Sequence, residues 1–205
     1  MKSKKYIVIG IVLAVLIIDQ LVKILVKTNM YLGESIPVLG NWFLISFTEN
    51  RGMAFGIEFG GDFGKLMLSL FRVALVTLIG LYIAQLIKKG AATTGVLVGL
   101  ALIMAGAIGN IIDSLFYGLI FNSPYPPELA SMFPPEGGYA GFLHGHVVDM
   151  LSFPIIETTW PSWVPFVGGN SFIFFRPIFN IADSAISVGV IYLFLFQRRF
   201  FLAKA

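Results

Sequence analysis

Four long apolar runs constrain this 205-residue chain more than any other feature. Each approaches or exceeds the roughly 18–20 residues that a helix needs to cross a bilayer. Only 12% of the residues are charged, about half the share in typical soluble domains. This composition excludes a disordered protein and disfavours a water-soluble one. We therefore predict a single all-α membrane domain over residues 1–205, with transmembrane helices at about Tyr6–Val26, Leu66–Ile87, Gly95–Leu119 and Pro177–Phe196.

The basic residues predict how these helices are oriented. Of the 14 Lys and Arg residues, eight lie at the amino end, in the connection between the second and third spans, and at the carboxyl end. Four lie in the other two connections, 27–65 and 120–176, and two lie within spans. Because connections rich in Lys and Arg stay in the cytoplasm, we expect both termini there and the two long connections outside. The net charge of +3 then requires no nucleic-acid partner.

Both outer connections contain segments with the composition of strands. Val38–Phe47 is rich in aromatic and β-branched residues, and Phe142–Phe153 is similar. Such segments are typical of short strands, so we expect a small β-rich region close to the membrane surface. Between the last two spans, Asn122–Gly141 is rich in Pro and Gly, which predicts an irregular loop.

Three carboxylates fall at similar depths in the predicted spans. An ionisable group inside a bilayer costs at least about 2.5–3.5 kcal/mol on insertion scales, so each requires a reason. At about 1.5 Å per residue, Asp19, Asp113 and Asp183 all lie in the outer third of the bilayer, although their helices run in opposite directions. This convergence indicates a shared site.

Two short motifs support the same site. Asn110-Ile-Ile-Asp113 and Asn180-Ile-Ala-Asp183 each separate an amide and a carboxylate by three residues, which puts the two groups on one helix face. The alternative is that these pairs serve helix packing. The matched depth of the two motifs favours a functional role over packing.

Other polar groups have mainly structural interpretations. Asp19 and Lys23 are four residues apart, and we interpret them as an ion pair rather than as direct participants in chemistry. Taken alone, the segment 50–52 reads as a turn. His144 and His146 lie two residues apart but have no obvious third ligand, so a zinc site is not favoured.

The presence of several carboxylates and the absence of cysteine restrict the chemistry that the site can perform. The chain has no Cys, which excludes a thiol nucleophile. Two carboxylates held close together share a proton, so that one can take a proton from water while the other polarises a carbonyl. Proton-coupled transport and a non-catalytic scaffold are the alternatives; a carrier would favour repeated halves and a site at the midplane. Spacing alone would pair Asp113 with Asp183.

Five motifs, in order along nearly the whole chain, resemble the bacterial lipoprotein signal peptidase family (signal peptidase II). They are Asp19-x-x-x-Lys23, Asn50-Arg51-Gly52-Met53-Ala54-Phe55, Gly106-Ala107-Ile108-Gly109-Asn110-Ile111-Ile112-Asp113, Val147-Val148-Asp149-Met150 and Phe179-Asn180-Ile181-Ala182-Asp183-Ser184. Any one of these motifs is weak. Their order on this predicted topology makes the resemblance specific.

The resemblance implies an intramembrane aspartyl endopeptidase of the bacterial cytoplasmic (inner) membrane. Such enzymes cut prolipoproteins just before a diacylglyceryl-modified cysteine, lie among membrane lipid, and require no metal or cofactor; we expect a monomer. The implied fold is four helices with an extracytoplasmic β-rich cradle and a short periplasmic helix. The family's catalytic aspartates match Asp149 and Asp183. The implied lining and supporting residues are Asn50, Gly52, Asn110, Asp113, Asn180, Asp19 and Lys23.

Two departures from the family pattern stand out. Ser114 occupies a position that is usually Arg in this family, so we expect Arg51 or Arg176 to supply a basic contact to the lipid or peptide. The connection 121–142 is longer than the family minimum, and its role is open: a lid, an extra surface for substrates, or neither.

Overall fold

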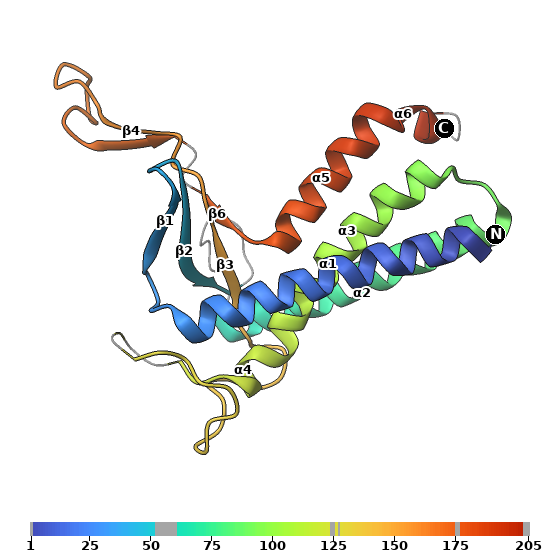
Figure 1. Ribbon diagram of the computed structural model, residues 1–205, viewed down its shortest axis with the longest axis horizontal. Coiled ribbons are helices and arrows are strands. Elements are labelled where there is room, and N and C mark those ends of the chain that lie inside the picture. The colour runs from blue at the N-terminus through green and yellow to red at the C-terminus, as the bar shows by residue number, and fades with distance from the viewer. Residues whose placement is uncertain (1, 52–60, 124–125, 127, 175–176, 203–205) are drawn as a thin grey trace.

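The computed structural model describes residues 2–51, 61–123, 126, 128–174 and 177–202. Within these residues, α3 continues through a π-helical turn, Asp113–Tyr117, into the short α4. The amino end of α1 and the short α6 lie at one end of the long helices, and the strands lie at the other end (Figure 1). The helices are α1 (Lys2–Asn29), α2 (Gly61–Lys89), α3 (Thr94–Ile112), α4 (Gly118–Ile120), α5 (Ile181–Phe196) and α6 (Arg198–Leu202).

Three helices in the described residues are long and apolar enough to cross a membrane: Lys2–Asn29, Gly61–Lys89 and Thr94–Ile120. They contain the first three predicted spans. The predicted start of the fourth span at Pro177 is wrong, because α5 begins only at Ile181. Its 16 residues extend about 24 Å, less than the roughly 30 Å of the hydrocarbon core. The fourth crossing therefore stays a prediction.

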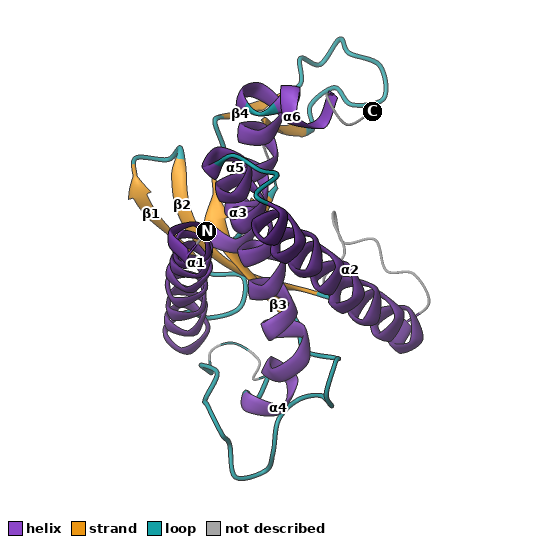
Figure 2. Cartoon of the chain, turned by 90° about the vertical axis from the view of Figure 1, so that its right-hand side faces the viewer, coloured by secondary structure: helices purple, strands orange, loops and turns teal. Residues whose placement is uncertain are grey.

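Helix α3 is the central element, with α1, α2 and α5 arranged around it (Figure 2). Its contact with α5 depends on Gly106, where a Cβ atom would lie 2.1 Å from the carbonyl oxygen of Ala182. Small residues of this kind let membrane helices approach closely. The outward helix faces carry exposed apolar side chains, such as Leu13, Leu78 and Phe194, that lipid would cover.

The strands form two antiparallel sheets in the described part of the chain. The larger has the order β1-β2-β3-β6, and the smaller pairs β4 with β5. In the larger sheet, Thr48 of β2 lies opposite Asp149 of β3. The strands are β1 (Ser35–Leu39), β2 (Phe43–Asn50), β3 (Val147–Ser152), β4 (Ile156–Thr159), β5 (Ser171–Phe174) and β6 (Ile178–Phe179).

The outer connections differ from the prediction in two respects. Val38–Phe47 contains strand structure, as predicted, but it is divided between two strands, because Gly40 adopts a φ of +53° and the turn there separates β1 from β2. The expected short helix is not present in the outer connections as far as the structure describes them; residues 52–60 lie outside that description. The described residues of the loop at Asn122–Gly141 are irregular, as predicted.

Candidate active site

A fully buried ammonium group joins α1 to α3. The Lys23 Nζ, 0% exposed, lies 2.9 Å from Asp19 Oδ2, 2.8 Å from Asp113 Oδ2 and 3.0 Å from Asn110 Oδ1. An ammonium has three N–H donors, so these three acceptors satisfy it. The predicted Asp19–Lys23 ion pair is therefore present, and Asp113 is a second carboxylate that contacts the same ammonium.

Both carboxylate oxygens of Asp113 are occupied. Its Oδ1 accepts a hydrogen bond from Gln20 Nε2 at 2.9 Å, and its Oδ2 accepts one from the backbone N–H of Val148 at 3.3 Å in addition to that from Lys23. The Tyr117 hydroxyl donates to Gln20 Oε1 at 3.1 Å. The sequence does not single out Gln20, because it is neutral and does not belong to an Asn-x-x-Asp motif. Asp113 is thus held by a neighbouring cation.

Asp183 lies in the first turn of α5, where Asn180 caps the helix. The backbone N–H of Asp183 donates to Asn180 Oδ1 at 2.9 Å, and the backbone N–H of Asn180 donates to Asp183 Oδ2 at 3.3 Å. This reciprocal arrangement is a capping box. The prediction that both residues lie within one helix is therefore wrong: Asn180 precedes the helix. Asp183 Oδ1 also accepts from Asn110 Nδ2 at 2.7 Å.

Asp149 is brought to Asp183 by strand β3. Its Oδ1 accepts from Asn180 Nδ2 at 2.7 Å, and its Oδ2 accepts from Asn50 Nδ2 at the end of β2. One side chain, Asn180, therefore contacts Asp149 and also caps the turn that holds Asp183. In the described residues, the carboxylates of Asp149 and Asp183 accept from neutral amides, whereas Asp113 contacts the charged Lys23.

The electrostatic setting of Asp149 favours its protonated form. Burial, which leaves the residue 5% exposed, raises its pKa to about 7, and the negative charge of Asp183 acts in the same direction. Hydrogen bonds from Asn50 and Asn180 and the charge of Lys23 act against this rise. The pair can therefore hold one proton near neutral pH, as two neighbouring carboxyl groups do in aspartic proteases.

Some predicted contacts lie elsewhere or outside the described residues. The Arg51 guanidinium lies 3.7 Å from Asp62 at the surface, whereas its backbone carbonyl accepts from Lys65 Nζ at 2.9 Å. Gly52 and Arg176 lie outside the described residues. Ser114, where the family usually has Arg, is buried and its Oγ accepts from Lys65 Nζ at 3.1 Å.

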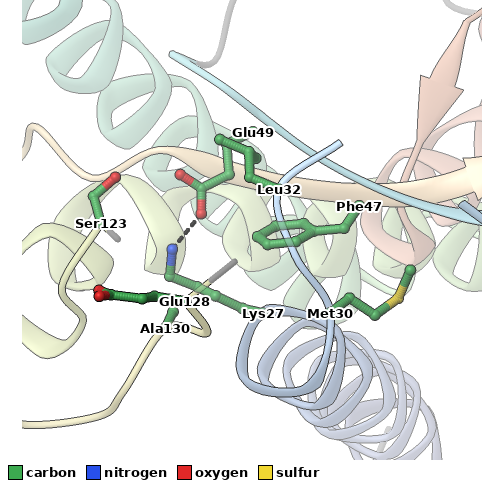
Figure 3. A pocket seen from close by; sticks show the side chains of 8 residues that line it. All are labelled: Lys27, Met30, Leu32, Phe47, Glu49, Ser123, Glu128 and Ala130. Carbon is green, nitrogen blue, oxygen red and sulfur yellow. Dashed lines mark hydrogen bonds and ion pairs between the residues drawn. The ribbon is translucent and has the colours of Figure 1, made fainter. Parts of the chain in front are cut away.

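A second buried ion pair lies beside the site, at the carboxyl end of α1. Lys27 donates to Glu49, whose other oxygen lies 3.3 Å from His146 Nδ1. Burial opposes the ionisation of Glu49, but His146 and Lys27 outweigh it and hold the Glu49 pKa below its ordinary value. Figure 3 shows the ion pair in a small pocket. The pocket is lined by Lys27, Met30, Leu32, Phe47, Glu49, Ser123, Glu128 and Ala130.

A metal site has no support in this arrangement. His146 faces Glu49, and His144 Nδ1 contacts the carbonyl of Phe142 at 2.9 Å. Among the residues that the structure describes, no three His, Cys, Asp or Glu side chains gather as metal ligands would. The expectation of a reaction without metal or cofactor stays a prediction.

Comparisons with known proteins agree on one family. Residues 11–199 match the family described as Signal peptidase (SPase) II. A protein of Porphyromonas gingivalis named lipoprotein signal peptidase is 50% identical over 193 residues, which cover 94% of this chain and 83% of that protein. A protein of the same name from Amoebophilus asiaticus is 38% identical over 192 residues, covering 92% of this chain and 76% of that protein.

A solved structure has a similar fold. It is described as a bacterial membrane enzyme determined by the in meso method at 2.3 Å resolution. It is 25% identical in sequence and superposes with a TM-score of 0.62, over 94% of this chain and 88% of that one.

Proposed function

The chain belongs to the signal peptidase II family, and from this premise we propose that it is an aspartyl endopeptidase that cuts prolipoproteins just before a diacylglyceryl-modified cysteine. The family and the relatives' names support a membrane protease of lipoprotein processing. The observation that carries the aspartyl mechanism is the contact of Asn180 with both Asp149 and Asp183. Asp113 has Lys23 as its partner and is therefore less suited to proton transfer.

The raised pKa of Asp149 supports one assignment of the two roles. Asp149 enters the reaction protonated and gives its proton to the oxygen of the scissile carbonyl, so that the tetrahedral intermediate carries two hydroxyl groups. Asp183 accepts a proton from water as the water oxygen attacks the carbonyl carbon. The C–N bond of the tetrahedral intermediate then breaks, and the leaving nitrogen takes the proton from Asp183. Asp149 regains its proton from one hydroxyl of the intermediate as the C–N bond breaks and the C=O bond forms again, so both carboxyl groups return to their starting protonation.

The other site residues orient these two groups. Asn50 and Asn180 hold the Asp149 carboxyl, while Asn110 holds that of Asp183. Asp19 accepts from the backbone N–H of Ala182 at 2.9 Å and so fixes the start of α5 against α1. Such fixed donors need no reorganisation when charge moves during the reaction. For Gly52 and Arg176 we propose the roles that the family resemblance and the family pattern suggest: Gly52 lines the site, and Arg176 contacts the lipid or peptide.

The membrane supplies the remaining recognition. We place the protein in the bacterial inner membrane with both termini in the cytoplasm and the site toward the outer face, as the distribution of basic residues supports. The acyl chains of the substrate would stay in lipid while its signal helix lies among the spans. The Arg51 guanidinium, which lies 3.7 Å from Asp62 at the surface, is proposed to contact the lipid or peptide of the substrate. A monomer suffices for this reaction, since one chain supplies both carboxyl groups.

The decisive experiment is incubation of the purified protein with a lipid-modified prolipoprotein. We expect cleavage by the wild type, and none by Asp149→Asn or Asp183→Asn protein that is folded. Glu136→Gln, which changes an exposed carboxylate in the loop between α4 and β3, is the matched control and should retain full activity. Substantial cleavage by either site variant would exclude the proposed pair. Proton-coupled flux in proteoliposomes without cleavage would favour a transporter instead.

A further inference from the structure

A lysine on α2 is buried without an anionic partner. Lys65 is 5% exposed, and its ammonium donates to the carbonyl of Arg51 at 2.9 Å and to Ser114 Oγ at 3.1 Å. Within the described residues these are its hydrogen bonds, and both acceptors are neutral. An ionised group at membrane depth with neutral partners is unfavourable, so its presence calls for a functional explanation.

The two acceptors belong to opposite sides of the candidate site. Arg51 directly follows Asn50, whose amide donates to Asp149. Ser114 lies on the helix that supports Asp183, because its hydroxyl donates to the carbonyl of Asn110 at 3.1 Å and Asn110 donates to Asp183. Lys65 therefore links the end of β2, on the Asp149 side, to α3, on the Asp183 side.

We propose that Lys65 is a positioning residue that keeps Asp149 and Asp183 in reacting geometry by joining the end of β2 to Ser114. This inference rests on the proposed function, since it concerns the same two carboxyl groups. Hydrogen bonds from a charged donor are shorter and stronger than those between neutral groups, which suits a link that must hold two elements in register. The link is indirect: Lys65 acts through Asn50 and Asn110.

The charges around the Lys65 ammonium argue against a role in anchoring α2 alone. Asp113 attracts the ammonium, while Arg72 and Arg51 repel it. Two like charges nearby make the location unfavourable for a lysine whose task is only to anchor α2. Ser69, one turn further along, already provides such an anchor, because its hydroxyl donates to the carbonyl of Leu143 at 3.0 Å.

Steady-state cleavage of a lipid-modified prolipoprotein tests the positioning role. We expect Lys65→Met to lower kcat at least about tenfold, since small displacements of reacting groups have effects of this size, and to leave KM within about threefold. Lys65→Arg should recover most of the rate. Ser69→Ala, the matched control on the same helix, should stay near wild type. The double variant Lys65→Met/Ser114→Ala should be no slower than Lys65→Met, because both changes break one link.

Equal losses in Lys65→Met and Ser69→Ala would show that Lys65 only anchors α2, and a loss confined to KM would show that it contacts substrate. Either result overturns the proposal.

A second measurement does not depend on activity. The chain has no cysteine, so spin labels can be placed at cysteines replacing the exposed residues Trp42, next to β2, and Leu119, in α4. We expect the distance distribution between the labels to broaden or shift in Lys65→Met but not in Ser69→Ala. An unchanged distribution overturns the role of Lys65. If the wild type cleaves nothing, the proposed function fails, while this distance still decides whether Lys65 joins the two sides.

Discussion

Asp149 lies in surroundings that make its ionised form unfavourable in the folded protein. Its pKa of about 7 lies above the ordinary value of 3.8, so the folded state retains a proton that the unfolded chain releases. The protonated Asp149 carboxyl therefore stabilises the folded state below pH 4, and this contribution to the free energy of unfolding is lost as the pH rises toward 7. At neutral and higher pH the carboxylate destabilises the fold that it serves.

We therefore expect Asp149→Asn to be inactive and yet more stable than the wild type at pH 8, by up to about 4 kcal/mol, which is the free energy that a rise in pKa from 3.8 to about 7 represents, with little difference at pH 4. Asparagine has the shape of the protonated carboxyl and carries no charge at either pH. Thermal or denaturant unfolding in detergent at both pH values measures the difference. A variant less stable than the wild type at pH 8 would show that the ionised form of Asp149 is well accommodated.

At this scale the sequence predicts some residues of the site better than others. The depth argument brings Asp19 and Asp113 together correctly, because both contact Lys23. Spacing along the chain could not select Asp149, whose position depends on β3 pairing with β2 and on its contact with Asn180. The sequence does not single out Lys65, because it lies at the boundary of a predicted span, where a basic residue is ordinary.

At the scale of elements, the site depends on the close approach of α3 and α5. Ala182 precedes Asp183, and its carbonyl oxygen occupies the space that a Cβ atom at Gly106 would need. The backbone N–H of Ala182 donates to Asp19. A displacement of α5 at this point would therefore move Asp183 directly.

We expect Gly106→Ala to destabilise the protein by about 1–3 kcal/mol, as overpacking does, and to lower activity because α5 must shift. Gly80→Ala on α2 is the matched control: its nearest neighbour, Met104 Sδ, would lie at an ordinary 3.7 Å, so stability should change by less than about 1 kcal/mol. Thermal unfolding and prolipoprotein cleavage measure both variants. Equal behaviour of the two would show that the helix contact at Gly106 is tolerant.

The elements themselves were predictable where one physical requirement dominates. Apolar length locates α1, α2 and α3, because crossing a bilayer requires it. The start of α5 was predicted too early, because the apolar run continues through β6 and hides the cap at Asn180. The division between β1 and β2 depends on the backbone of Gly40, which alternation of side chains does not indicate.

At the scale of the whole molecule, the helices and strands are segregated along one axis (Figure 1). The candidate site lies where they meet, with Asp149 on a strand and Asp183 at the start of a helix. This location allows lipid to cover the apolar helix faces while the sheet end approaches the aqueous phase. An enzyme acting on a membrane-embedded signal helix needs both surroundings at the cut site.

The orientation of this axis is the last prediction. Because basic residues concentrate at the end that holds the termini and the α2–α3 connection, that end should face the cytoplasm. The native chain has no cysteine, so single cysteines report position without background. We expect a membrane-impermeant maleimide, applied to spheroplasts, to label Trp163→Cys, which replaces an 80% exposed residue beyond β4, but to label Ala91→Cys only after lysis. Labelling of Ala91→Cys in intact spheroplasts, with Trp163→Cys labelled only after lysis, would contradict this orientation. It would put Asp149 and Asp183 on the cytoplasmic side, where the cut site of a translocated prolipoprotein could not reach them.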